Sequence, residues 1–222
     1  MESTTTLFIK TPRTARVAIL GELSEEVEEC WIVMHGYRQL AARFLRRFEP
    51  FAADKRIIVA PEGLSRFYLQ DQRPHVGASW MTREDRLHEI EDQLQYLQNL
   101  YHHLKEQLSP NVKWHLFGFS QGVATVWRWL LKGSIKPASL TICCGLLPEE
   151  SSPLLEEKLK GLPLCNIYAL KDEFIPLEKA KEHAQKVANA YPQTHNLAVD
   201  GPHELHSKML SLWMDKFASH LA

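Results

Sequence analysis

The chain has 222 residues, a length that favours one domain over two, and 45% of its residues are hydrophobic while 24% are charged. This composition is typical of globular proteins and excludes the disordered, collagen-like and disulfide-scaffold classes. Lysine and arginine number 26 against 27 aspartate and glutamate, so the formal net charge of −1 does not favour nucleic acid or an anionic membrane as a partner. We therefore expect a single domain over residues 1–222 that acts on a small molecule.

Membrane and secretion signals are missing from the sequence pattern. No apolar run approaches the roughly 18 residues that a spanning helix requires, and residues 1–6 lack the basic and apolar parts of a secretory signal. The four cysteines form no CxxC pair, and each lies in or beside an apolar run: Cys30, Cys143, Cys144 and Cys165. We expect buried, reduced thiols in a cytoplasmic protein without stable membrane insertion. The sequence does not distinguish a monomer from a homodimer.

Short apolar runs predict strands along most of the chain. Residues 16–23 and 30–34 are expected to form two neighbouring strands, joined by an acidic turn at 24–29. Most of the later runs are nearly continuous rather than alternating, which is typical of strands that are covered on both faces in a parallel sheet. These later runs are 57–60, 112–117, 139–144, 165–170 and 196–199.

Helical patterns lie between these runs. The clearest covers residues 83–108, with apolar side chains three or four positions apart, Thr82 as its expected N-cap and Ser109-Pro110 as its end. The other predicted helices are 38–48, 121–132, 177–190 and 205–221. This alternation predicts a doubly wound α/β fold, mostly parallel, with helices on both faces and no large cap domain. Its site is expected where the strands end at their carboxyl edge.

One motif at this edge predicts a nucleophile. Gly118-Phe119-Ser120-Gln121-Gly122 is a G-x-S-x-G sequence between a predicted strand and a predicted helix. In a nucleophile elbow the serine has a strained backbone, and the two glycines allow strand and helix to approach closely. The alternative is an ordinary turn in which Ser120 only caps the following helix.

A serine nucleophile needs a histidine as base and an acid that orients it. Asp172 follows the predicted strand 165–170, and Glu173 is its nearest rival. His203 follows the last predicted strand, whereas His206 is expected to lie within the final helix, so we assign the base to His203. The order serine, acid, histidine along the chain is the one expected for this fold.

Acyl transfer also requires N–H donors for the negative charge that forms on the carbonyl oxygen. The backbone N–H of Gln121, directly after the nucleophile, is one candidate. We place the second at the N–H of Tyr37, in the loop that follows strand 30–34. His35 precedes the glycine of this loop, and we expect it to order the loop by hydrogen bonds rather than act as a base.

Metal and thiol chemistry are the weaker alternatives. His203, Glu204 and His206 suggest a metal site, but their spacing is not H-E-x-x-H and no third ligand is evident. Cys143 and Cys144 end a predicted strand without a G-x-C-x-G elbow. We expect no metal and no organic cofactor.

These motifs together resemble the phospholipase/carboxylesterase family of α/β-hydrolases, which includes relatives of acyl-protein thioesterases and lysophospholipases. The resemblance covers nearly the whole chain, and residues 77–86 look more like bacterial carboxylesterases. It implies an α/β-hydrolase fold, a triad of Ser120, Asp172 and His203, no cofactor, and hydrolysis of carboxylic esters or thioesters. The matching stretches are residues 33–37, 59–63, 118–122 and 201–204, together with Asp172 and Pro176.

The long connection at residues 62–81 is a candidate wall of the substrate pocket, because it is aromatic and unusually long for a loop. Trp80 is the candidate substrate contact, with packing in the core as the alternative. We expect a serine hydrolase that cleaves esters of short to medium acyl chains through an acyl-enzyme. The alternatives are a lysophospholipase, an acyl-thioesterase, or a non-catalytic binding module on the same fold.

Overall fold

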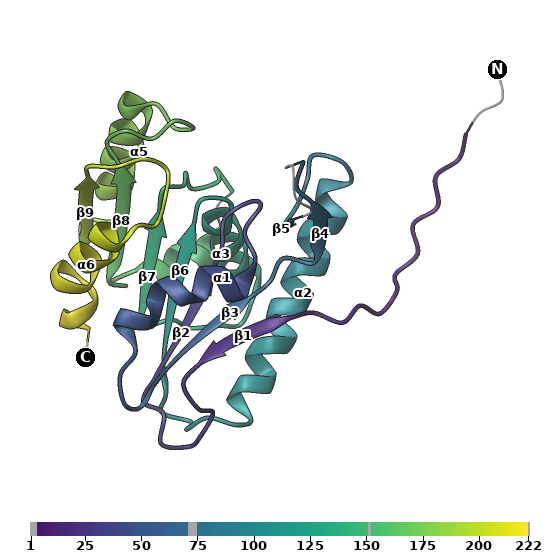
Figure 1. Ribbon diagram of the computed structural model, residues 1–222, viewed down its shortest axis with the longest axis horizontal. Helices are drawn as coiled ribbons and strands as arrows, with labels where there is room; N and C mark the ends of the chain where they lie inside the picture. Colours follow the sequence, from purple (N-terminus) through teal and green to yellow (C-terminus); the bar gives the residue numbers. More distant parts are fainter. Residues whose placement is uncertain (1–3, 71–74, 151, 222) are drawn as a thin grey trace.

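The computed structural model describes residues 4–70, 75–150 and 152–221. Its main sheet has seven strands in the order β1-β3-β2-β6-β7-β8-β9 (Figure 1). All neighbouring pairs are parallel except the first, in which β1 runs antiparallel to β3. The strands are β1 (Val17–Leu20), β2 (Glu29–Met34), β3 (Arg56–Pro61), β6 (Lys113–Phe119), β7 (Ser139–Cys143), β8 (Leu164–Ala169) and β9 (Thr194–Val199).

Helices cover both faces of this sheet, and the alternation of side chains along each strand fills two separate cores. One core contains α2 (Arg86–Lys105), α3 (Gln121–Lys132), α4 (Pro153–Leu159) and α5 (Leu177–Ala190). The other contains α1 (Ala41–Leu45), the 3-10 segment η1 (Arg46–Phe51) and α6 (Ser207–Lys216), which precedes η2 (Ala218–His220). Strand β2 shows the division: Ile32 faces the first core and Val33 faces the second. The predicted doubly wound α/β class is confirmed.

The first two predicted strands are not neighbours, so that prediction is wrong. Strand β3 lies between β1 and β2, with Ala18 opposite Ala60. The connection between β1 and β2 is too long for a tight hairpin and buries Val27. It then crosses the start of β3, where the N–H groups of Glu28 and Glu29 both donate to the Lys55 carbonyl oxygen.

The predicted bounds of the first two helices need correction. The helix expected at 38–48 is only the short α1, and the chain continues into η1, which contains Pro50. Helix α2 begins after Asp85 rather than Thr82, because Asp85 has a left-handed backbone (φ 46°) that interrupts the helix there. Thr82 instead bonds Glu89 in the first turn of α2, through both its N–H and its hydroxyl.

Three features were not expected from the sequence pattern or lie elsewhere than predicted. A hairpin of β4 (Ser65–Tyr68) and β5 (Val76–Ser79) occupies the connection that was predicted as a loop at 62–81, of which residues 71–74 lie outside the described part. Helix α4 follows Ser152, whose hydroxyl caps it. His206 caps α6 through Nδ1 and is not inside it.

Candidate active site

The connection between β6 and α3 has the geometry of a nucleophile elbow. Ser120 has φ 53° and ψ −118°, a strained conformation for a residue with a side chain. A Cβ atom on Gly118 would lie 2.8 Å from the Gly122 carbonyl oxygen, and one on Gly122 would lie 2.4 Å from the Met34 carbonyl oxygen. Only glycine fits at these two positions, because strand β6, helix α3 and the end of β2 meet there without intervening space.

The structure brings three residues together that are far apart in the sequence. His203 Nε2 lies 2.7 Å from Ser120 Oγ, and His203 Nδ1 lies 2.6 Å from Asp172 Oδ2. A carboxylate oxygen can only accept, so the ring carries its proton on Nδ1 and accepts the Ser120 hydroxyl proton at Nε2. Asp172 follows β8 and His203 follows β9, so the carboxyl ends of neighbouring strands place both beside the elbow.

Asp172 is fixed by its own loop. Its Oδ1 accepts the backbone N–H groups of Phe174 and Ile175, both at 2.8 Å, which leaves Oδ2 for the imidazole. Glu173, the rival acid, also contacts His203, but its Oε2 accepts the His203 backbone N–H at 2.9 Å rather than a ring proton. The hydrogen bond from the His203 N–H is the largest cause of the lowered pKa of the Glu173 carboxyl. The two acids therefore hold different parts of the same histidine.

The loop after β2 packs directly on Ser120. A Cβ atom on Gly36 would lie 3.2 Å from Ser120 Cβ. The N–H of Gly36 is occupied by Gln39 Oε1 at 2.8 Å, and the N–H of Arg38 donates to the Ala78 carbonyl oxygen at 2.9 Å. Within the described part of the chain, no hydrogen bond pairs the N–H of Tyr37 with an acceptor. The loop therefore leaves the Tyr37 N–H available while its neighbours are bonded.

His35 orders this loop as expected. Its Nδ1 donates to the Gly36 carbonyl oxygen at 2.8 Å, and its Nε2 accepts the Gly63 N–H at 3.0 Å, so the neutral ring satisfies both partners. Burial lowers the pKa of His35 to about 4, against a smaller opposite effect of the Gly36 hydrogen bond. Protonation would place a second donor against the Gly63 N–H.

Trp80 packs against His35 and holds the same loop by a hydrogen bond. Its ring is stacked on His35 with centroids 4.9 Å apart, and its indole N–H donates to the His35 carbonyl oxygen at 2.8 Å. Only 1% of Trp80 is exposed, which agrees with the alternative that it packs in the core. The substrate contact predicted for this side chain has almost no accessible surface in this arrangement.

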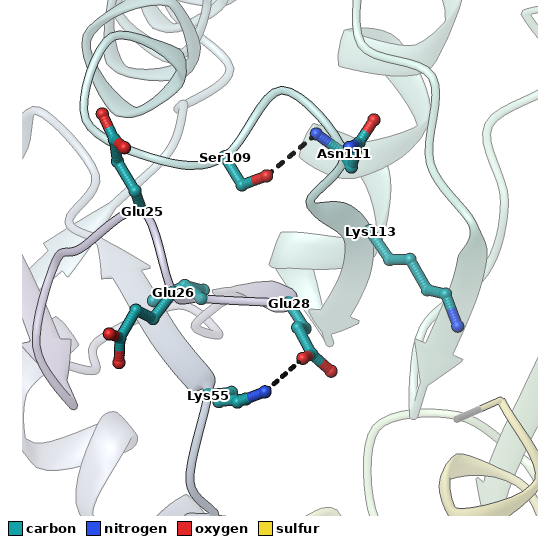
Figure 2. Close-up of a pocket in the computed structure, with 8 residues that line it drawn as sticks. Glu25, Glu26, Glu28, Lys55, Ser109, Asn111 and Lys113 are labelled. Atoms are coloured by element: carbon teal, nitrogen blue, oxygen red, sulfur yellow. Dashed lines mark hydrogen bonds and ion pairs between the residues drawn. The ribbon is translucent and has the colours of Figure 1, made fainter.

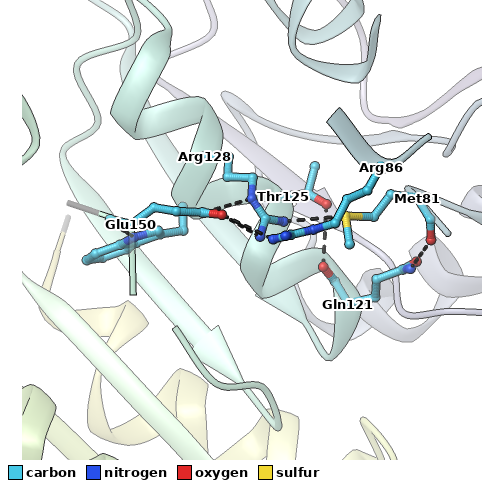
Figure 3. Close-up of polar contacts among 7 residues, drawn as sticks. Met81, Arg86, Gln121, Thr125, Arg128 and Glu150 are labelled. Atoms are coloured by element: carbon cyan, nitrogen blue, oxygen red, sulfur yellow. Dashed lines mark hydrogen bonds and ion pairs between the residues drawn. The ribbon is translucent and has the colours of Figure 1, made fainter. Parts of the chain in front are cut away.

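The side chain of Gln121 joins the elbow to the segment that carries Trp80. Its Oε1 accepts the Trp80 N–H at 3.0 Å, and its Nε2 donates to the Met81 carbonyl oxygen at 2.8 Å. Further along α3, Arg128 forms a two-pronged ion pair with Glu150 at 2.8 and 3.1 Å, and Arg86 of α2 joins the same carboxylate at 3.2 Å (Figure 3). These contacts tie α2, α3 and the chain after β7 together beside the elbow.

Two polar residues near the site were missed by the sequence reasoning. Gln39 caps the Gly36 N–H, and buried Glu62 accepts the Ala41 N–H at 3.1 Å through Oε2, which fixes the start of α1. Neither was predicted as a site residue, although Glu62 lies in the matching stretch 59–63. Only the tertiary arrangement shows that they hold the loop at residues 35–39.

A hollow of about 590 Å³ lies at the other edge of the sheet, by the amino ends of β2, β3 and β6. Figure 2 shows its acidic and basic lining, including the Glu28–Lys55 ion pair at 2.6 Å. It is larger than the hollow beside Asp172, but it is lined mainly by solvated surface groups and lies at the opposite edge of the sheet from Ser120, Asp172 and His203. Among the residues that the structure describes, no cluster of three or more His, Cys, Asp or Glu side chains could hold a metal ion.

Comparisons with known proteins identify the family of this chain. The family model for phospholipase/carboxylesterase matches residues 23–221. The chain belongs to the phospholipase/carboxylesterase family. This family is one of hydrolases, and the resemblance seen in the sequence motifs is confirmed.

Solved structures of similar fold include acyl-protein thioesterase 2 from Zea mays, at 14% identity and a TM-score of 0.72, with 94% of this chain and 100% of that chain covered. Esterase PE8 is 19% identical with a TM-score of 0.68, covering 94% and 99% of the two chains. TT1662 from Thermus thermophilus is 15% identical with a TM-score of 0.67, covering 94% and 98%. No curated protein matches the sequence. At these identities the likeness confirms the α/β-hydrolase fold, while the family model carries the assignment.

Among the described residues, no helix is both long and apolar enough to cross a membrane. All four cysteines are free and buried, as expected. Burial raises the pKa of the Cys30 and Cys165 thiols, which keeps them protonated and unreactive.

Proposed function

We propose that this protein is a serine esterase that cleaves carboxylic esters of short to medium acyl chains through an acyl-enzyme intermediate. The observation that carries the proposal is the pair of short contacts of His203, at 2.7 Å to the Ser120 hydroxyl and at 2.6 Å to the Asp172 carboxylate. A serine, a histidine and a carboxylate in this order of contact are the parts that nucleophilic acyl transfer requires.

In this proposal Ser120 Oγ attacks the ester carbonyl carbon while His203 Nε2 takes the hydroxyl proton. Asp172 stabilises the imidazolium that forms. The negative charge on the carbonyl oxygen is held by the N–H groups of Tyr37 and Gln121, which protein acceptors leave unpaired in the described part of the chain. His203 then gives its proton to the departing alcohol, and water releases the acyl group by the reverse sequence of proton transfers.

Trp80 has a positioning role in this scheme. Its indole N–H holds the His35 carbonyl oxygen, two residues before the Tyr37 N–H. Gln121 holds the Trp80 backbone, so the two oxyanion donors are connected through one chain of hydrogen bonds. This connection supports a preorganised site, in which donors need no rearrangement when charge develops.

The test compares wild type with Ser120→Ala on p-nitrophenyl acetate and p-nitrophenyl octanoate. We expect Ser120→Ala to lose at least about a thousandfold in kcat, because the three residues act as a unit. Ser109→Ala, at the far hollow, is the matched control and is expected to keep the wild-type rate. Labelling with a fluorophosphonate, followed by mass spectrometry, is expected to modify Ser120.

Equal rates for wild type and Ser120→Ala, with no labelling at Ser120, would contradict the esterase proposal and favour a binding module. A thioester and a lysophospholipid with the same acyl chain distinguish the alternatives within the family. We expect the oxygen ester of an uncharged alcohol to be cleaved with the highest kcat/KM. The reverse order would favour a thioesterase or a lysophospholipase.

A further inference from the structure

Phe174 covers the imidazole of His203 on the solvent side. The two ring centroids are 5.0 Å apart and the planes meet at 74°, an edge-to-face contact. Phe174 is 73% exposed, whereas the His203 side chain is only 10% exposed. Phe119, which is buried, lies near the same imidazole with centroids 5.4 Å apart. Of the two aromatic rings that contact His203 in the described part of the chain, Phe174 is therefore the exposed one.

The position of Phe174 is fixed relative to the imidazole. Asp172 Oδ1 accepts the Phe174 N–H at 2.8 Å, while Oδ2 of the same carboxylate holds His203 Nδ1. A second bond, from the Ile175 N–H, completes the turn. The backbone of Phe174 is thus tied to the acid that orients the base, and its ring lies edge-to-face against the imidazole.

The chemistry of the proposed reaction decides which part of the substrate meets this ring. Because His203 Nε2 must hand its proton to the departing oxygen, the alcohol part of the ester has to lie beside the imidazole. The carbonyl oxygen points the other way, toward the N–H groups of Tyr37 and Gln121. Phe119 is buried in the core, so Phe174 is the exposed ring beside the imidazole that an alcohol part can contact.

Glu173 gives this exit a negative charge. Its carboxylate is exposed and is held beside His203 by the His203 N–H at 2.9 Å. Lys171, two residues before Glu173, is paired with Asp200 at 2.8 Å. An anionic alcohol part would therefore meet a like charge at the place where it must sit.

We propose that Phe174 and Glu173 form a subsite for the leaving group, which selects esters of uncharged, apolar alcohols and disfavours anionic ones. This inference rests on the proposed esterase function and names the class of its substrate. The phenyl ring of Phe174 supplies apolar contact area to the alcohol. The Glu173 carboxylate supplies the discrimination against negative charge.

The experiment uses butyrate esters, so that the acyl part is constant. Phenyl butyrate and methyl butyrate report on apolar contact, and the 4-carboxyphenyl and 4-carbamoylphenyl esters report on charge. Comparing each ratio of kcat/KM between wild type and variant cancels the intrinsic reactivity of the esters. We expect Phe174→Ala to lower the phenyl to methyl ratio about tenfold, and Phe174→Leu to restore most of it.

For charge, we expect Glu173→Gln to raise the ratio of kcat/KM for the 4-carboxyphenyl ester to that for the 4-carbamoylphenyl ester about fivefold, because the substitution removes the like charge. The amide oxygen can still accept the His203 N–H, so the loop keeps its contact. The gain should shrink at high salt. Leu87→Ala removes an equally exposed apolar side chain from α2 and is expected to leave both ratios unchanged. Circular dichroism and thermal unfolding establish that each variant is folded.

The outcomes separate the inference from the function on which it rests. If Phe174→Ala slows both esters equally, the ring only shields the imidazole and the subsite is overturned. Ratios that stay at wild-type values in both variants overturn it as well. In either case loss of activity in Ser120→Ala would still support the esterase. Hydrolysis that does not depend on Ser120 would instead contradict the function itself.

Discussion

The side-chain amide of Gln121 bonds the backbone of Trp80, with Oε1 accepting the Trp80 N–H at 3.0 Å. The same amide donates from Nε2 to the Met81 carbonyl oxygen at 2.8 Å. The Gln121 side chain therefore has a structural role of its own. It connects the elbow to the tryptophan that holds the loop after β2 through the His35 carbonyl oxygen.

This connection predicts the effect of Gln121→Met, which keeps the length of the side chain and removes the amide. We expect kcat to fall about tenfold or more, because the oxyanion donors lose their common support. The free energy of unfolding should fall by about 1 to 3 kcal/mol, since the Trp80 N–H loses its partner. Urea unfolding and ester kinetics measure the two effects. Gln95→Met, at an exposed position of α2, is the control. An equal loss of kcat and stability in that variant would contradict the prediction.

The division of labour between the two acids predicts different losses. Asp172→Asn leaves an amide that no longer favours the required imidazole tautomer, so we expect kcat to fall by about 10⁴. Glu173→Gln keeps an acceptor for the His203 N–H and is expected to cost less than tenfold on an uncharged ester. Steady-state kinetics on p-nitrophenyl acetate compare them. A larger loss in Glu173→Gln would identify Glu173 as the acid.

Acid pH is expected to destabilise the fold through its buried histidines. Burial lowers the pKa of both His35 and His115 to about 4, against 6.5 for an ordinary histidine. Below pH 6.5 these two histidines bind protons in the unfolded chain but stay neutral in the folded chain. The free energy of unfolding therefore falls progressively until about pH 4. Each histidine then costs the folded state about 3 kcal/mol, because a tenfold change in an equilibrium constant corresponds to about 1.4 kcal/mol.

Urea unfolding between pH 7.5 and pH 4 measures this loss. His35→Asn should be less stable at pH 7.5 but lose stability less steeply, since one of the two buried groups is gone. His103→Asn, which alters an exposed residue on α2, is the control and should follow the wild-type curve. A His35→Asn curve parallel to wild type would show that His35 does not carry the effect.

Close packing at the elbow predicts that Gly122→Ala is severe. Its Cβ would lie 2.4 Å from the Met34 carbonyl oxygen, so strand β2 and helix α3 must separate. We expect a loss of about 3 kcal/mol in stability and a fall in kcat of at least about a hundredfold. Gly161→Ala is the matched control. It has φ +72° but no atom within 4 Å of the added Cβ, so it should cost about 1 kcal/mol and leave kcat unchanged.

Equal effects of the two substitutions on kcat would contradict the role given to the elbow. Thermal unfolding and kinetics on p-nitrophenyl acetate provide the comparison. The difference between the two variants isolates steric contact from backbone strain, because only Gly122 faces a neighbouring strand.

Much of the fold follows from local pattern. Continuous apolar runs require cover on both faces, so they predicted the parallel strands β3, β6, β7, β8 and β9. The glycines around Ser120 indicated a tight strand-to-helix turn, and polar residues after β8 and β9 indicated one edge of the sheet as the site. The cytoplasmic location stays a prediction.

Tertiary structure alone decided what pattern could not. The sequence left Asp172 and Glu173 as rivals, and only the fold shows that one meets the imidazole ring and the other its backbone. Strand β1 pairs with β3 rather than with β2, because the connection after β1 passes the start of β3 before β2 begins. Proximity in the chain therefore did not predict the pairing. The aromatic character of Trp80 suits a pocket wall and a core equally, and packing against His35 placed it in the core. Residue type determines which contacts are chemically available. The distances between remote segments are fixed only when all strands pair and the helices pack on both faces of the sheet.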